Sequence, residues 1–396
     1  MRFLLFLLAG WVSGVTVAAE SFSSGPVAKE KLTLGELMGV NGHTVLFKPQ
    51  LYRPVATRVR DYHPVSWDLG ENPEANANFP WAKNRVNWEQ VYGSWRKEKW
   101  DIDVCLMFES IPVANWETER LEENAGRYGE AFARNFGPSG KRGLVHAVEI
   151  GNEPGGFSDV TYRRIFRAMA AGARKGDPEM KIATCALTLG KSHAYAKNVE
   201  CLQGLDSLYD ALNIHVYAQV EGWPTWRRSF PEDPQIAYLR EVQRLIDWRD
   251  TQVPGKEIWI TEFGWDATTQ KPDPQTEFKR WEGSTEIQQA QWLVRSYLLW
   301  AAMDVDRAYV YFFNDDDKAQ VHGSSGLTRN FQPKPAFRAL ARLREVLGDY
   351  CFAGKLVEQA GEVYAYAFVS KKNPRQRILA VWSPTGNNRQ AEIIIP

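Results

Sequence analysis

Two stretches decide the fold expected of this chain: Glu149-Ile150-Gly151-Asn152-Glu153-Pro154 and Trp259-Ile260-Thr261-Glu262-Phe263-Gly264-Trp265. Each begins as an apolar run typical of a buried strand and reaches a glutamate that loop residues follow at once. The ends of parallel strands gather at one edge of a sheet. We therefore expect Glu153 and Glu262 to meet at one end of a sheet.

Six further runs of the same kind occur along the chain, separated by helical patterns. All eight are short, apolar at most positions and bounded by Gly, Pro, Asn or Asp, as in parallel strands buried on both faces. The expected strands cover residues 37–41, 56–62, 103–108, 145–151, 181–186, 212–216, 257–261 and 308–313. Eight strands alternating with helices predict an α/β fold, a (β/α)₈ TIM barrel.

The first residues have the pattern of a secretory signal peptide. Arg2 precedes an apolar run and the small residues 17–19, which predicts a signal over residues 1–19 cleaved before Glu20. The run is interrupted and shorter than the roughly 20 apolar residues of a membrane span. We therefore expect a secreted or periplasmic protein with no membrane attachment after cleavage.

The remainder is expected to form a barrel over residues 20–348 and a small β appendage over 349–396. After Gly348 the apolar period changes from 3.6 to two. Three appendage strands are expected, over residues 363–369, 378–382 and 391–395.

Local signals mark several helices and one long loop. Ser158 begins a helix that runs to about residue 175, Thr285 with Gln288 forms a capping box, and Pro335 suits the first turn of another helix. Residues 63–86, rich in Pro and Asn, predict a loop long enough to be functional.

Composition excludes some functions. The 48 basic and 48 acidic residues give no net charge, which argues against a nucleic-acid partner. The 16 Trp residues fit sugar stacking and a large core equally well.

Cysteine and histidine spacings predict no metal site, and no cofactor is expected. Cys185 and Cys201 are the one pair that could form a disulfide; the oligomeric state stays open.

Strands four and seven face each other across a barrel of eight, so Glu153 and Glu262 can share one cleft. Two such carboxylates can cleave a glycosidic bond: one protonates the leaving oxygen and the other attacks or stabilises the anomeric carbon. A solvated loop carboxylate or a helix-cap neighbour is the structural alternative for each. Glu109 closes strand three as a rival carboxylate, for which a subsite contact or a structural pair is favoured.

At this point the chain resembles clan A of the glycoside hydrolases, most closely families 39 and 5. Asn152-Glu153-Pro154 is similar to the acid/base signature of the clan, and Thr261-Glu262-Phe263-Gly264 to its nucleophile strand. His215-Val216-Tyr217 matches a third element, and Lys334-Pro335-Ala336-Phe337 resembles the end of a family 39 barrel. The resemblance extends over the whole expected barrel, from about residue 35 to about residue 345.

The resemblance implies roles for the catalytic residues. It makes Glu153 the general acid/base and Glu262 the nucleophile. Asn152 would bind the 2-hydroxyl of the sugar, although turn formation alone also explains an Asn at this place.

It also implies roles for neighbouring residues. Tyr217 would donate a hydrogen bond to the nucleophile, with core packing as the alternative, and Arg60 would keep the nucleophile ionised. We expect His215 to contact the sugar or a carboxylate rather than a metal. Trp265 directly follows the nucleophile strand and is the best candidate for sugar stacking.

The sequence thus predicts a secreted retaining β-glycosidase that degrades a poly- or oligosaccharide. A catalytically silent carbohydrate-binding barrel is the alternative from another class. A transglycosylase using the same site is the third possibility, because it differs only in the acceptor that reaches the intermediate.

Overall fold

A computed structural model of the chain describes residues 5–8, 15–17, 32–190, 195–385 and 393–395. Parallel strands form a ring in the order β6-β5-β4-β3-β11-β10-β9-β7, and pairing of β6 with β7 closes it. The strands are β3 (Met38–Asn41), β4 (Arg58–Pro64), β5 (Asp101–Met107), β6 (Ala147–Ile150), β7 (Lys181–Thr188), β9 (Ala211–His215), β10 (Glu257–Phe263) and β11 (Arg307–Val310). The predicted (β/α)₈ barrel is confirmed.

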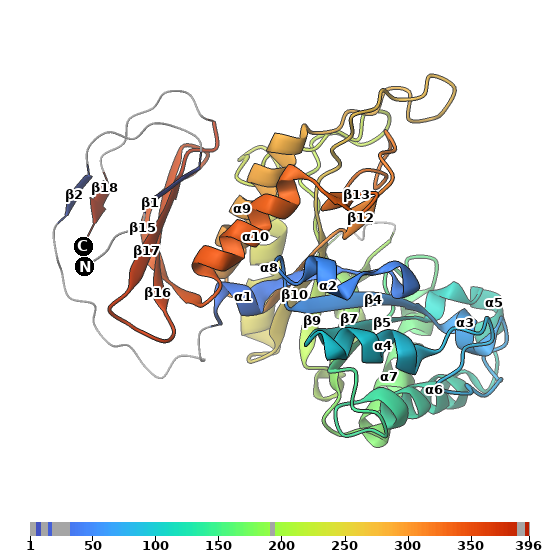
Figure 1. Cartoon of the computed structure of the whole chain (residues 1–396). Helices are drawn as coiled ribbons and strands as arrows, with labels where there is room; N and C mark the ends of the chain where they lie inside the picture. Colours follow the sequence, from blue (N-terminus) through green and yellow to red (C-terminus); the bar gives the residue numbers. More distant parts are fainter. Residues whose placement is uncertain (1–4, 9–14, 18–31, 191–194, 386–392, 396) are drawn as a thin grey trace.

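Helices cover the outside of this ring (Figure 1). The longer helices are α4 (Trp88–Lys97), α6 (Leu121–Phe136), α7 (Asp159–Gly176), α8 (Tyr238–Gln252), α9 (Glu286–Ala301) and α10 (Pro335–Leu347). Shorter ones are α1 (Leu34–Leu37), α2 (Pro49–Tyr52), α3 (Val65–Leu69) and α5 (Val113–Trp116). Where the chain is described, none is both long and apolar enough to cross a bilayer.

The helix-start signals act as their chemistry predicts. The Thr285 hydroxyl accepts from the Gln288 N–H, and the Gln288 side chain accepts from the Thr285 N–H, which completes the capping box of α9. Ser158 caps α7 in the same way by accepting from the Thr161 N–H. The segment 63–86, expected to be a loop, instead begins with the last two residues of β4 and continues into helix α3.

A second sheet follows the barrel and consists mainly of antiparallel strands. It contains β15 (Tyr350–Gln359), which the sequence did not predict, β16 (Val363–Ser370) and β17 (Arg377–Trp382). β1 (Leu5–Leu8) pairs with the free edge of β17, and β18 (Ile393–Ile395) pairs with β2 (Val15–Val17). The C-terminal β appendage is confirmed as an element of the fold.

Some expectations fall outside what the structure describes. The cleavage point before Glu20 and residues 391–392 of the third expected strand lie outside the described residues. The signal peptide and the boundary at residue 348 stay predictions. Cys185 and Cys201 are buried free thiols, so the disulfide considered for them is not formed.

The appendage sheet packs against α9 and α10 at the side of the barrel (Figure 1). Trp382 of β17 lies at this contact, and its ring stacks on Tyr364 of the neighbouring β16 with centroids 5.0 Å apart. Its indole N–H donates to Glu232 at 2.6 Å, and Glu232 forms a buried ion pair with Arg295 of α9. Barrel and sheet therefore share one hydrophobic core.

Trp382→Ala should lower the free energy of unfolding by about 3–5 kcal/mol, the usual cost of emptying a buried aromatic site. The side chain is 3% exposed, and its removal also takes the indole donor from the buried Oε1 of Glu232, which keeps only its ion pair with Arg295. Trp223→Ala is the matched control, because Trp223 is 70% exposed and should change stability little. Urea denaturation of both variants measures the difference; equal effects would contradict the shared core.

Candidate active site

The two glutamates come from β6 and β10, which are separated in the ring by β7 and β9. Glu262 lies on β10, and Glu153 lies three residues beyond the end of β6. The intervening Gly151 has a φ of +83°, and a Cβ there would lie 2.6 Å from the ring of Phe108. A glycine is therefore required for the turn that brings Glu153 over the barrel.

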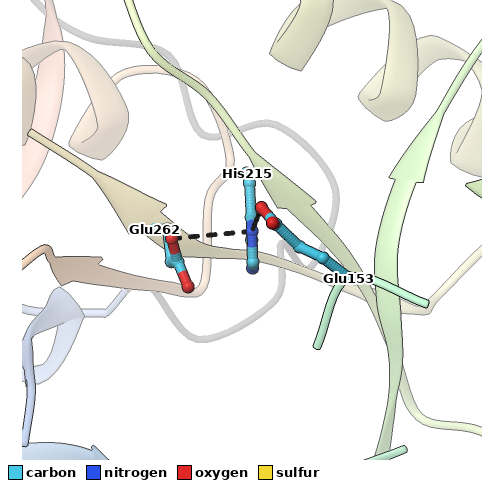
Figure 2. Close-up of side chains that lie close together, drawn as sticks. All are labelled: Glu153, His215 and Glu262. Carbon is cyan, nitrogen blue, oxygen red and sulfur yellow. Dashed lines mark hydrogen bonds and ion pairs between the residues drawn. The ribbon is translucent and has the colours of Figure 1, made fainter. Parts of the chain in front are cut away.

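His215, the last residue of β9, lies between the two carboxyl groups (Figure 2). Its Nδ1 is 2.8 Å from Oε1 of Glu153 and 3.7 Å from Oε2 of Glu262. One oxygen from each carboxyl group and a ring nitrogen of His215 lie within 4.8 Å of one another. The structure therefore brings Glu153, Glu262 and His215 into one cluster, with His215 on a carboxylate.

Both oxygens of Glu262 accept hydrogen bonds. The Tyr62 hydroxyl donates to Oε1 at 2.7 Å, and the Tyr217 hydroxyl donates to Oε2 at 2.9 Å. Arg60 places Nη1 3.5 Å from Oε1. Tyr217 and Arg60 thus contact the carboxylate for which the sequence proposed them.

These contacts decide the charge state of Glu262. Burial raises the pKa of its carboxyl group, but His215, Arg60 and the Tyr62 hydroxyl outweigh burial and hold the pKa below its usual value. Burial likewise lowers the pKa of His215, while the carboxylates of Glu262 and Glu153 outweigh it and raise the pKa. Glu262 is therefore an anion at neutral pH.

Asn152 and Glu109 belong to the same site. The Asn152 side-chain oxygen accepts from Arg60 at 2.8 Å, which leaves its amide N–H groups as donors toward the cleft. Glu109 accepts from the backbone N–H groups of Asn152 and Glu153 at 2.6 and 3.3 Å. Burial raises the pKa of Glu109 to about 7, against the lowering effect of these donors. Glu109 thus holds the turn that carries Glu153.

Trp265 is not brought into the cleft. Its side chain is 1% exposed, packs against Tyr238 and Trp292 in the helix layer, and donates its indole N–H to the Ser229 carbonyl at 2.8 Å. Trp265 therefore presents no accessible ring face, and a sugar cannot stack on it as expected in this structure. Its position next to the nucleophile strand was the only basis for that expectation.

The cleft above the carboxylates has a volume of about 340 Å³. Aromatic and apolar side chains form much of its wall beside the polar groups. Its lining residues are His43, Thr44, Tyr62, Pro64, Trp67, Met107, Asn152, Glu153, Glu262, Tyr311, Phe312 and His322.

Two of these residues were not predicted from the sequence. Tyr62 was missed, although alternation along a strand puts it on the same face as Arg60. The sequence had no signal for His322, which lies in a long loop.

The cluster does not suit a metal ion. Both oxygens of Glu262 already accept from hydroxyl groups, and the Arg60 guanidinium lies beside them. Nε2 of His215 contacts the Thr261 hydroxyl at 3.0 Å. A cation would have to displace these donors and approach a fixed positive charge.

Tyr62→Phe should shift the acid limb of the pH–activity profile to higher pH. Loss of a hydrogen bond to the charged form raises the pKa of Glu262, and a bond to a charged group contributes about 1.5–3 kcal/mol. We expect a loss of about 10–100-fold in kcat/KM. Tyr311→Phe is the matched control, because Tyr311 lines the same cleft without donating to Glu262. An unchanged acid limb in Tyr62→Phe would contradict this role.

No family model and no curated protein matches the sequence. Solved structures match the fold. A family 39 glycoside hydrolase from the gut symbiont Bacteroides cellulosilyticus WH2 has a TM-score of 0.63 and 18% identity, covering 86% of this chain and 72% of that chain.

Two further structures are similar over most of the chain. A glucosidase from Croceicoccus marinus has a TM-score of 0.57 and 14% identity, covering 85% of this chain and 75% of its own. The β-glycosidase BGL167 has a TM-score of 0.51 and 13% identity, covering 78% and 86%. The expected likeness to family 39 and other clan A-like glycoside hydrolases is thus confirmed in the fold, an eight-stranded parallel barrel that this chain shares with them.

Proposed function

We propose that this protein is a retaining β-glycosidase that hydrolyses O-glycosidic bonds of a poly- or oligosaccharide by double displacement. The observation that carries the proposal is the approach of one carboxylate oxygen of Glu153 and one of Glu262 to within 4.8 Å. Retaining enzymes separate their carboxyl groups by about 5–5.5 Å, whereas inverting enzymes need about 6.5–9.5 Å to admit a water molecule.

In the first step, Glu262 attacks the anomeric carbon while Glu153 gives its proton to the departing glycosidic oxygen. The bond to the leaving sugar breaks and an ester to Glu262 forms. In the second step, Glu153 takes a proton from water, whose oxygen attacks the anomeric carbon and releases Glu262 as a carboxylate.

The surroundings of each group support these roles. An attacking carboxylate must be ionised, and Arg60, His215 and Tyr62 favour the ionised form of Glu262. The hydrogen bond between Arg60 and the Asn152 oxygen leaves Asn152 able to donate to the 2-hydroxyl, a contact that strengthens in the transition state.

The compared proteins support a carbohydrate as the substrate, since they are a family 39 glycoside hydrolase, a glucosidase and a β-glycosidase. Secretion, or export to the periplasm, follows from the signal pattern of residues 1–19 and is part of the same proposal.

A reducing-sugar screen of the purified protein against plant, algal and bacterial polysaccharides tests the function. Proton NMR of the first product should show the β-anomer before mutarotation. An α-anomer as first product would exclude retention. Saccharide binding without turnover would favour the silent barrel, and longer products at high acceptor concentration would favour transglycosylation.

A further inference from the structure

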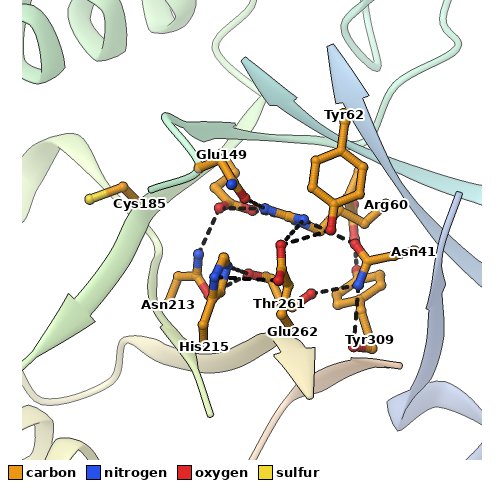
Figure 3. Close-up of polar contacts among 12 residues, drawn as sticks. Asn41, Arg60, Tyr62, Glu149, Cys185, Asn213, His215, Thr261, Glu262 and Tyr309 are labelled. Atoms are coloured by element: carbon orange, nitrogen blue, oxygen red, sulfur yellow. Dashed lines mark hydrogen bonds and ion pairs between the residues drawn. The ribbon is translucent and has the colours of Figure 1, made fainter. Parts of the chain in front are cut away.

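A third carboxylate, Glu149, lies beneath the catalytic pair and takes no part in the two chemical steps. It is a buried residue of β6, four positions before Glu153. Three donors point at it: Nε and Nη2 of Arg60 at 2.7 and 2.9 Å, and Nδ2 of Asn213 at 2.7 Å (Figure 3). Three donors, two of them from a cationic guanidinium, favour the ionised form of this carboxyl group.

The first branch from Glu149 runs through Arg60. Held by two bonds to Glu149, the guanidinium donates to the Asn152 side-chain oxygen at 2.8 Å and to the Asn41 side-chain oxygen at 2.9 Å. It also approaches Glu262 at 3.5 Å. Glu149 therefore fixes the direction of the Asn152 amide and the position of the charge beside the nucleophile.

The second branch runs through Asn213 and has a defined direction. Because Nδ2 of Asn213 donates to Glu149, its Oδ1 faces Thr261 and accepts from the Thr261 hydroxyl at 2.6 Å. With its proton committed, the Thr261 oxygen can only accept from Nε2 of His215 at 3.0 Å. Nε2 is then protonated, and Nδ1 shares one proton with Glu153.

We infer that Glu149 is a positioning residue that sets both catalytic carboxylates at once. Through Arg60 it orients the groups around Glu262, and through Asn213 and Thr261 it selects the His215 tautomer that shares a proton with Glu153. The link to catalysis rests on the proposed function, whereas the hydrogen-bond order itself does not.

Other charged or titratable groups act on Glu149 as well. Burial, helped by the charge of Glu262, raises the pKa of the Glu149 carboxyl above its usual value, although Arg60 and His215 act to lower it. Cys105 of β5, Glu109 beyond it and Cys185 of β7 also interact with this carboxyl. Unlike Arg60, these three groups and His215 donate no hydrogen bond to Glu149 in the part of the chain that the structure describes.

The test uses the purified chain with ¹⁵N-labelled histidine, because imidazole nitrogen shifts distinguish the two neutral tautomers from imidazolium. Loss of one signal in His215→Asn assigns His215. The spectra are recorded over a range of pH. In the wild type we expect Nε2 of His215 to stay protonated at every pH of this titration. An Nδ1–H neutral tautomer would overturn the inference without any activity measurement.

Glu149→Gln should change that spectrum. A glutamine cannot accept from all three donors, so Asn213 can turn over and the Nδ1–H tautomer should become populated. Loss of a nearby anion should also lower the pKa of His215. Glu257→Gln is the matched control, since Glu257 begins β10 at the opposite end of the barrel and pairs with Lys181.

Thr261→Val keeps the inference testable if Glu149→Gln does not fold, because it breaks only the second branch. It should remove the preference for Nε2–H while the pairing of Arg60 with Glu149 persists. A His215 spectrum unchanged in the folded variants would overturn the inference.

The kinetic arm separates positioning from simple loss of stability. Glu149→Gln should lower kcat/KM by about 10–100-fold and move both limbs of the pH profile to lower pH, because one anion has left the site. A uniform fall with unchanged limbs would mean a structural role only. Absence of glycosidase activity in the wild type would refute the proposed function but leave the NMR result standing.

Discussion

Glu262→Ala is expected to reduce turnover of aryl β-glycosides by about 10⁴-fold or more, because no other group can form the covalent ester. Tyr62, Tyr217 and Arg60 all converge on this one carboxylate. Its removal therefore leaves several donors and a cavity where the nucleophile stood. We expect the folded state to survive. Thermal unfolding, followed separately from activity, checks this.

Azide turns this loss into a positive result. The small anion should enter the space that Glu262 leaves, attack the same face of the sugar and release an α-glycosyl azide, which NMR identifies. Glu109→Ala is the control, because Glu109 is a neighbouring carboxyl group that contacts the backbone of Asn152 and Glu153 instead. A β-glycosyl azide from Glu262→Ala would reverse the assignment of the two catalytic glutamates.

Buried parallel strands were the most predictable part of this protein. All of the barrel strands except the polar β4 are largely apolar runs, and each of the eight was expected within a few positions of its place in the structure. β15 was missed for a physical reason. It is half-exposed, and register shifts at Phe352–Gly354 and Lys355–Val357 break the alternation by which a strand is recognised.

The catalytic pair was predictable because both residues lie at or just beyond the C-terminal end of a barrel strand. The structure brings Glu153 and Glu262 together. The expectation for Trp265 was wrong, because the chain has by then turned outward, and its ring packs on Trp292 of α9. The pairing of Glu149 with Arg60 joins residues 89 positions apart, which no local pattern reveals.

Glu153→Ala should separate substrates by their leaving groups. General acid catalysis contributes about 10²–10⁴-fold, so polysaccharides and alkyl glycosides should lose that much activity in the first step. Dinitrophenyl glycosides need no protonation and should still form the ester with Glu262 at nearly the normal rate.

The second step should then become slow, because water has lost the base that Glu153 provides. A burst of dinitrophenol equal to the enzyme concentration, followed by slow release of sugar, is the expected time course. Azide needs no base, so it should accelerate this release and give the β-glycosyl azide.

Glu153→Gln is the matched variant, because it keeps the shape of the side chain beside His215 but has no acidic proton. It should behave like Glu153→Ala. Equal loss of activity on dinitrophenyl glycosides and on polysaccharides, with no burst, would show that Glu153 is not the acid. The proton would then have to come from another group, and the neighbouring Glu109, whose pKa burial raises to about 7, is the carboxyl that would be tested next.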